Sequence, residues 1–120
     1  MERASEGDDT MRPRRSMKRD IKRMVDRIVE RFGPEKVILF GSLARDEGGP
    51  DSDVDLLVVM DVEGCKRAKQ LELRVSLHDV RVPKDVIVSS PEDFEWRKEI
   101  VGTIERVAAR EGRVLYDASS

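Results

Sequence analysis

The stretch LFGSLARDEGGPDSDVDLLVV, residues 39–59, decides the fold and holds the residues with the clearest chemistry. One apolar run, KVILF at 36–40, ends at a glycine–serine pair, and a second, DVDLLVVM at 53–60, begins with two aspartates. Short continuous apolar runs of this kind are typical of strands that are covered on both faces. The stretch therefore predicts two buried strands joined by a polar, glycine-rich loop.

Asp53 and Asp55 lie two residues apart in the second run. On a strand their side chains project from the same face, with Cα atoms about 6.5–7 Å apart. Two parallel, partly buried carboxylates repel each other, and one takes a proton unless a cation sits between them. Oxygen ligands favour a hard divalent ion such as Mg²⁺. A single cysteine and a single histidine argue against zinc.

Gly41 and Ser42 follow the first apolar run, where a glycine lets the backbone turn tightly and approach a ligand. The next residues, 42–47, predict a short helix, whose free N–H groups and dipole favour an anion. The Ser42 hydroxyl adds a donor, although a plain helix N-cap is an equal and compatible role. A phosphate-binding corner beside a metal pair suits a metal-complexed triphosphate.

Asp85 begins a third apolar run, DVIVSS at 85–90, as Asp53 begins the second. If the two strands are neighbours, Asp85 lies beside the aspartate pair. Three carboxylates can hold two metal ions, one to orient a triphosphate and one to lower the pKa of an attacking hydroxyl. Taken alone, the aspartate pair fits ordinary turn chemistry at a strand entrance equally well.

The rest of the chain alternates predicted helices with these strands. Apolar spacing predicts helices at 17–32 and 66–77, and Ser90-Pro91 is typical of a helix start. The last helix is expected to break at Gly102, and residues 112–117 form either a final strand or a packed tail. The apolar faces assigned to the second and last helices consist of Ala68, Leu71, Val75 and Leu77, and of Trp96, Ile100, Ile104, Val107 and Ala108.

The order of elements predicts an α/β fold in one domain of residues 17–117, preceded by a polar, disordered tail at 1–16. Charged residues make up 40% of the 120 residues, but Lys+Arg 23 and Asp+Glu 25 nearly cancel, which leaves no broad basic face for duplex nucleic acid. No apolar run reaches the roughly 20 residues that span a bilayer, and none resembles a signal peptide. We expect a cytoplasmic protein without a membrane partner.

Gly41-Ser42, ten further residues, and then Asp53-Val54-Asp55 fit the GS-x10-D-x-D signature of the polymerase-β-like nucleotidyltransferase superfamily. Over residues 17–117 the chain most resembles the minimal nucleotidyltransferases, small prokaryotic proteins that often form toxin–antitoxin pairs with a HEPN-domain partner. The resemblance implies a palm-like nucleotidyltransferase fold, a small mixed sheet of three to four strands flanked by helices.

The resemblance also implies a role for each site residue. Asp53 and Asp55 would bind two Mg²⁺ ions, with Mn²⁺ as an alternative, and Asp85 would bind the catalytic ion and help to deprotonate the acceptor. Gly41-Ser42 would contact the β- and γ-phosphates, and Arg45 would neutralise triphosphate charge.

The chain departs from the family pattern directly after Arg45. Family members often read ARG where this chain has Ala44-Arg45-Asp46, and Glu47 and Asp51 add further negative charge. These acids weaken nucleotide binding unless they point outward or pair with Arg45.

The expected function is transfer of a nucleoside monophosphate, AMP from ATP in the first place, to a hydroxyl of a partner protein or a small molecule. A chain of this length has little room for an acceptor pocket, so a HEPN-type partner or a homo-oligomer would complete it. The alternative is a non-catalytic antitoxin that masks a partner and has a weak or vestigial nucleotide site.

Overall fold

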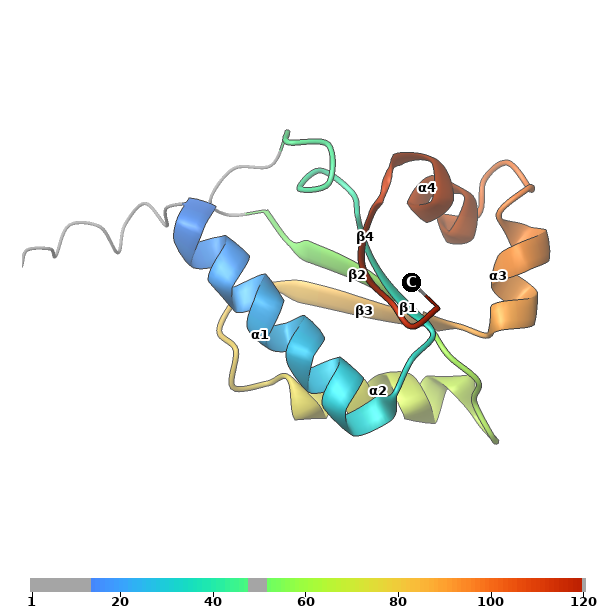
Figure 1. Ribbon diagram of the computed structural model, residues 1–120, viewed down its shortest axis with the longest axis horizontal. Helices are drawn as coiled ribbons and strands as arrows, with labels where there is room; N and C mark the ends of the chain where they lie inside the picture. Colours follow the sequence, from blue (N-terminus) through green and yellow to red (C-terminus); the bar gives the residue numbers. More distant parts are fainter. Residues whose placement is uncertain (1–13, 48–51, 120) are drawn as a thin grey trace, which may run out of the picture.

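The computed structural model describes residues 14–47 and 52–119, which form four helices and four strands (Figure 1). The helices are α1 (Arg14–Phe32), α2 (Lys66–Ser76), α3 (Pro91–Arg97) and α4 (Ile104–Glu111), and the strands are β1 (Lys36–Phe40), β2 (Val54–Val59), β3 (Lys84–Ser89) and β4 (Arg113–Asp117). Most of the predicted tail, residues 1–13, lies outside the described residues, as does Asp51.

The strands form one mixed sheet in the order β3-β2-β1-β4. β1 pairs antiparallel with β2 and with β4, whereas β2 and β3 run parallel. The predicted α/β class is therefore confirmed, as are the neighbouring second and third strands. The C-terminal segment is a strand, and it lies at the edge of the sheet opposite β3.

The sheet has an apolar core on each face. Side chains alternate along a strand, so β2 packs Val54, Leu56 and Val58 under α1 and α2, while Leu57 and Val59 face the side of α3 and α4. Figure 1 shows the two pairs of helices on opposite sides of the strands. Both faces of the central strands are covered, as the continuous apolar runs predicted.

α1 starts at Arg14, three residues before the predicted helix. The sequence did not indicate this start, because Arg14-Arg15-Ser16 are polar and give no periodic signal. Its buried residues include Met24 and Ile28, as the spacing predicted. Within residues 14–47 and 52–119, no helix is long and apolar enough to cross a membrane.

The apolar face predicted for α2 is largely wrong. Leu71 and Val75 are 62% and 59% exposed, and the helix buries Leu73 instead. Leu77, directly after the helix, is buried as predicted. The buried stripe includes Gln70, whose side chain accepts a hydrogen bond from the Val88 amide of β3 at 2.9 Å. Two stripes with helical spacing overlap in this segment, and the one that faces the sheet contains Gln70, which binds the strand edge.

The face predicted for the last helix is also wrong in part. The segment forms two short helices, each capped by a hydroxyl: Ser90 accepts from the Asp93 amide and Thr103 from the Arg106 amide, both at 3.1 Å. The chain reverses between them, with Gly102 at a φ of +96°. The interruption leaves Trp96, Ile100, Ile104 and Val107 exposed. Ala108 is buried as predicted, and Phe94 fills the core beside it.

Candidate active site

Asp55 and Asp85 lie side by side in the structure. β2 and β3 are parallel, and their register pairs Asp55 with Asp85. Hydrogen-bonded strands are about 4.8 Å apart, and paired residues point to the same face. Val54 and Leu56 pack under α1 and α2, so Asp55 projects from the other face of the sheet. The second and third strands are thus neighbours, and Asp85 lies beside Asp55 of the aspartate pair, as the sequence predicted.

The carboxylate of Asp55 is surrounded by negative charge. Partial burial raises the pKa of Asp55, and the nearby charges of Asp85 and then Asp53 raise it further. Among the described residues, no hydrogen bond or ion pair reaches this side chain. Asp53 stands one residue before β2 and is exposed. A carboxylate in such surroundings is stabilised by an added cation.

Gly41 lies directly against the Asp55 carboxylate. It follows β1, whose last residue Phe40 pairs with Asp55. Its φ is +83°, and a Cβ at this position would stand 2.4 Å from Asp55 Oδ2. No side chain fits there, so the backbone passes the carboxylate at a distance that only glycine allows.

The predicted helix at 42–47 is wrong: residues 42–46 form a tight turn. The amides of Ala44 and Arg45 donate to the Gly41 carbonyl oxygen at 3.1 and 3.3 Å, but Asp46 adopts a φ of +61°, which ends the helical path. Within the described part of the chain, the amides of Ser42 and Leu43 donate no hydrogen bond. Adjacent free N–H groups beside a glycine remain suited to an anion.

Arg45 is engaged by acids rather than directed at the aspartates. It contacts Glu47 at 3.0 Å and Glu111 at 3.2 Å. Asp46 contacts Arg113 at 2.8 Å. Glu47 therefore pairs with Arg45, which is one of the two arrangements expected to keep the extra acids from weakening nucleotide binding. Asp46 pairs instead with Arg113 of β4. The role of Arg45 toward a triphosphate stays a prediction.

Arg74 is the neighbour of the site that sequence reasoning missed. From the last turn of α2, its Nη2 donates to Asp85 Oδ1 at 2.8 Å. β3 is an edge strand, so a side chain from α2 can reach round it. No motif carries this signal, because the contact depends on how α2 packs against β3.

The donor set fits a hard divalent cation, because it consists of carboxylates whose like charges raise the pKa of Asp55. The carboxylates do not, however, converge on a single point. Over residues 14–47 and 52–119, no three histidine, cysteine, aspartate or glutamate side chains are grouped as a ready metal site. Asp53, Asp55 and Asp85 are near enough to interact, but Asp85 is held by Arg74.

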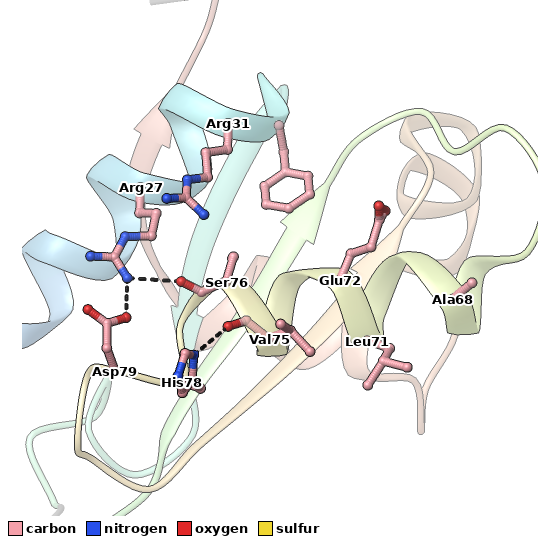
Figure 2. A pocket seen from close by; sticks show the side chains of 10 residues that line it. Arg27, Arg31, Ala68, Leu71, Glu72, Val75, Ser76, His78 and Asp79 are labelled. Carbon is pink, nitrogen blue, oxygen red and sulfur yellow. Dashed lines mark hydrogen bonds and ion pairs between the residues drawn. The ribbon is translucent and has the colours of Figure 1, made fainter.

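A pocket of about 770 Å³ opens elsewhere, between α1 and α2 (Figure 2). Its lining includes Leu71 and Val75 of α2, together with Arg27, which donates to the Ser76 carbonyl oxygen at 2.9 Å and to Asp79. None of the three aspartates is among its lining residues. The candidate active site is therefore a surface at the strand ends, separate from this pocket.

The sequence of the chain matches a known protein family and a relative of that family. Residues 21–110 match the model of the family described as "Nucleotidyltransferase domain". A protein of Methanocaldococcus jannaschii named "Putative protein adenylyltransferase" is 37% identical over 82 residues, which cover 68% of this chain and 78% of the relative.

Two solved structures share the fold. A "putative nucleotidyltransferase" from Sulfolobus solfataricus has a TM-score of 0.55 and 23% identity, over 85% of this chain and 81% of the other. A structure described as "the toxin-antitoxin with AMP-PNP" has a TM-score of 0.55 and 18% identity, over 82% of this chain and 72% of the other. These likenesses confirm the predicted palm-like sheet and its flanking helices.

Proposed function

The chain belongs to the nucleotidyltransferase domain family, and on this premise we propose that it transfers AMP from ATP to a hydroxyl group of a partner protein. The observation that carries the proposal is the placement of Gly41 against Asp55, which is itself paired with Asp85. A turn whose free amides would suit a phosphate and a group of carboxylates then lie together at one end of the sheet.

In the proposed reaction the acceptor oxygen attacks the α-phosphorus of ATP. The bond from that phosphorus to the bridging oxygen breaks, pyrophosphate leaves, and the hydroxyl proton passes to a nearby base, for which Asp85 is the nearest candidate on β3. Asp53, Asp55 and Asp85 would hold Mg²⁺ or Mn²⁺ ions. When bound, these ions neutralise phosphate charge and lower the pKa of the attacking hydroxyl.

The residues of the turn orient the nucleotide. Gly41 lets the turn pass directly against the Asp55 carboxylate. The amides of Ser42 and Leu43 donate no hydrogen bond within the described part of the chain, so they would be available to a phosphate. Because Glu47 and Asp46 are paired with arginines, their charges are partly compensated, which reduces their repulsion of a triphosphate.

A protein acceptor is supported by the name of the M. jannaschii relative, and a toxin–antitoxin context by the description of one structural neighbour. We infer that the partner is a HEPN-type toxin, in line with the sequence resemblance. In this arrangement the partner supplies the acceptor and the chain acts as the antitoxin.

The test uses ATP labelled with ³²P at the α- or at the γ-position, with Mg²⁺ and an extract of the cells that produce the chain. We expect label in a protein only from α-labelled ATP, together with pyrophosphate release, and no label with Asp53→Asn. Label from γ-labelled ATP would indicate a kinase instead. If neither α- nor γ-labelled ATP labels a protein, although the chain neutralises its partner in cells, the non-catalytic antitoxin is favoured.

A further inference from the structure

The ion pair between Arg74 and Asp85 lies at the edge of the proposed metal site. The contact is 2.8 Å long, and both side chains are about half exposed, at 50% and 48%. Asp85 is paired in register with Asp55, whose pKa it raises. Arg74 is therefore a cation that binds one of the three carboxylates from outside the site.

We propose that Arg74 is a positioning residue that competes with the metal ion for Asp85. In the structure Arg74 holds Asp85, and it must release that carboxylate before Asp85 joins Asp53 and Asp55 around a divalent cation. The inference rests on the proposed function, because it takes these three aspartates as the metal ligands.

The charges of the site support this competition. Asp55 has only like charges and burial acting on it, whereas Asp85 already has a positive partner. A metal ion and a guanidinium that share one carboxylate repel each other, so each weakens the binding of the other by the same factor.

The exposure of the pair determines how strong the competition is. An ion pair that is half exposed contributes little to stability, since water screens it. The side chains can therefore turn apart without disturbing the core, and a metal ion can displace the arginine. Arg74 is then expected to tune metal affinity rather than abolish it.

The experiment measures Mn²⁺ binding to the full chain by electron paramagnetic resonance of the free ion, with calorimetry as a second readout. Arg74→Gln is expected to tighten Mn²⁺ binding by about threefold to tenfold. Arg74→Lys keeps the positive charge and should stay within about twofold of the wild type. Arg67→Gln removes the same charge from the first turn of α2 and serves as the matched control, with no expected change.

A double-mutant cycle separates competition from general repulsion. If Arg74 acts through Asp85, Arg74→Gln tightens Mn²⁺ binding in the wild-type background and not in Asp85→Asn. An equal gain in both backgrounds would show that Arg74 acts on the metal only at a distance, and would overturn the inference.

The remaining outcomes are also distinguishable. Equal Mn²⁺ affinity in wild type and Arg74→Gln, or weaker binding in the variant, overturns the inference but leaves the metal site in place. Binding that appears only in Arg74→Gln supports it. Binding in neither protein overturns both the inference and the proposed metal site.

Discussion

Each end of β3 lies beside a carboxylate of another element: Ser89 contacts Glu105 of α4, and Asp85 is paired with Asp55 of β2. The two carboxylates, Glu105 and Asp55, differ in how their negative charge is compensated. At the far end, Glu105 is 5% exposed; its Oε2 accepts from Ser89 Oγ at 2.9 Å, and its Oε1 contacts Arg97 Nε at 3.2 Å. At the near end, Asp55 is partly buried beside two other aspartates, with no hydrogen bond or ion pair to its side chain among the described residues.

The difference separates a structural carboxylate from a functional one. A buried charge whose oxygens are bonded stabilises one arrangement of the elements around it, here β3, α3 and α4. A carboxylate that is surrounded by like charges lowers the stability of the empty protein and is compensated only when a cation arrives. We therefore assign the Glu105 network (Ser89, Arg97 and Glu105) to the fold, and we propose that the aspartate site (Gly41, Asp53, Asp55 and Asp85) serves catalysis.

The largest expected effect is that of Asp55→Asn on nucleotide transfer. Loss of a ligand that holds the metal ions removes several kcal/mol of transition-state stabilisation, so the rate should fall about a thousandfold or more. The measurement is the initial rate of AMP incorporation from α-labelled ATP. A rate within tenfold of wild type would place catalysis elsewhere.

Gly41→Ala should come next. The new Cβ would stand 2.4 Å from Asp55 Oδ2, and the backbone φ of +83° disfavours any side chain. We expect transfer to fall by about tenfold to a hundredfold and stability by about 1–3 kcal/mol.

Gly64→Ala is the matched control for this change. Gly64 has a φ of +91°, and a Cβ added to it would meet nothing within 4 Å. The variant should lose similar stability through backbone strain while keeping its transfer rate. Equal losses of transfer in the two variants would mean that Gly41 acts through strain and not through its contact with Asp55.

Glu105→Gln should have the opposite profile. The substitution removes the charge that compensates Arg97 and weakens the bond to Ser89, so stability should fall by about 1–3 kcal/mol in urea unfolding. The transfer rate per folded molecule should not change. A specific loss of transfer would break the distinction between the two ends of β3.

The smallest expected effect concerns the stability of the metal-free protein. The pKa of Asp55 is raised in the folded state, so the folded chain binds this proton more tightly, and stability falls as the pH rises above the unfolded-state value. Asp55→Asn removes this loss, and its Tm should exceed that of wild type by about 2–4 °C at neutral pH.

The same pair of proteins gives the pH test. The difference in Tm should disappear near pH 4 and below, where an aspartate of the unfolded chain also takes up its proton, its pKa being about 3.9. A variant that is less stable than wild type at neutral pH would show that the Asp55 charge is compensated by a partner.

Much of the site could be predicted from local sequence. The sequence did not predict the register that pairs Asp85 with Asp55, or the contact of Gly41 with that carboxylate. It did predict that Asp85 lies beside the aspartate pair and that Gly41 follows the end of a strand. These features depend on alternation along strands, which the sequence expresses directly.

The remaining features depend on packing between distant elements. Leu71 was expected to be buried, but α2 turns Leu73 toward the sheet, together with Gln70, which binds the edge of β3. The same placement of α2 brings Arg74 to Asp85. Periodicity shows that a helix has an apolar stripe but cannot rank two overlapping stripes, so neither result could be read from the sequence.

We propose that the aspartate site binds a metal–nucleotide complex, and calorimetric titration of Mg²⁺–ATP into the purified chain, run beside Asp53→Asn, tests this claim. We predict binding that requires Mg²⁺ and is lost in the variant. ATP binding of equal strength without Mg²⁺ or in Asp53→Asn, or no binding in either Mg²⁺ or Mn²⁺, would contradict the claim.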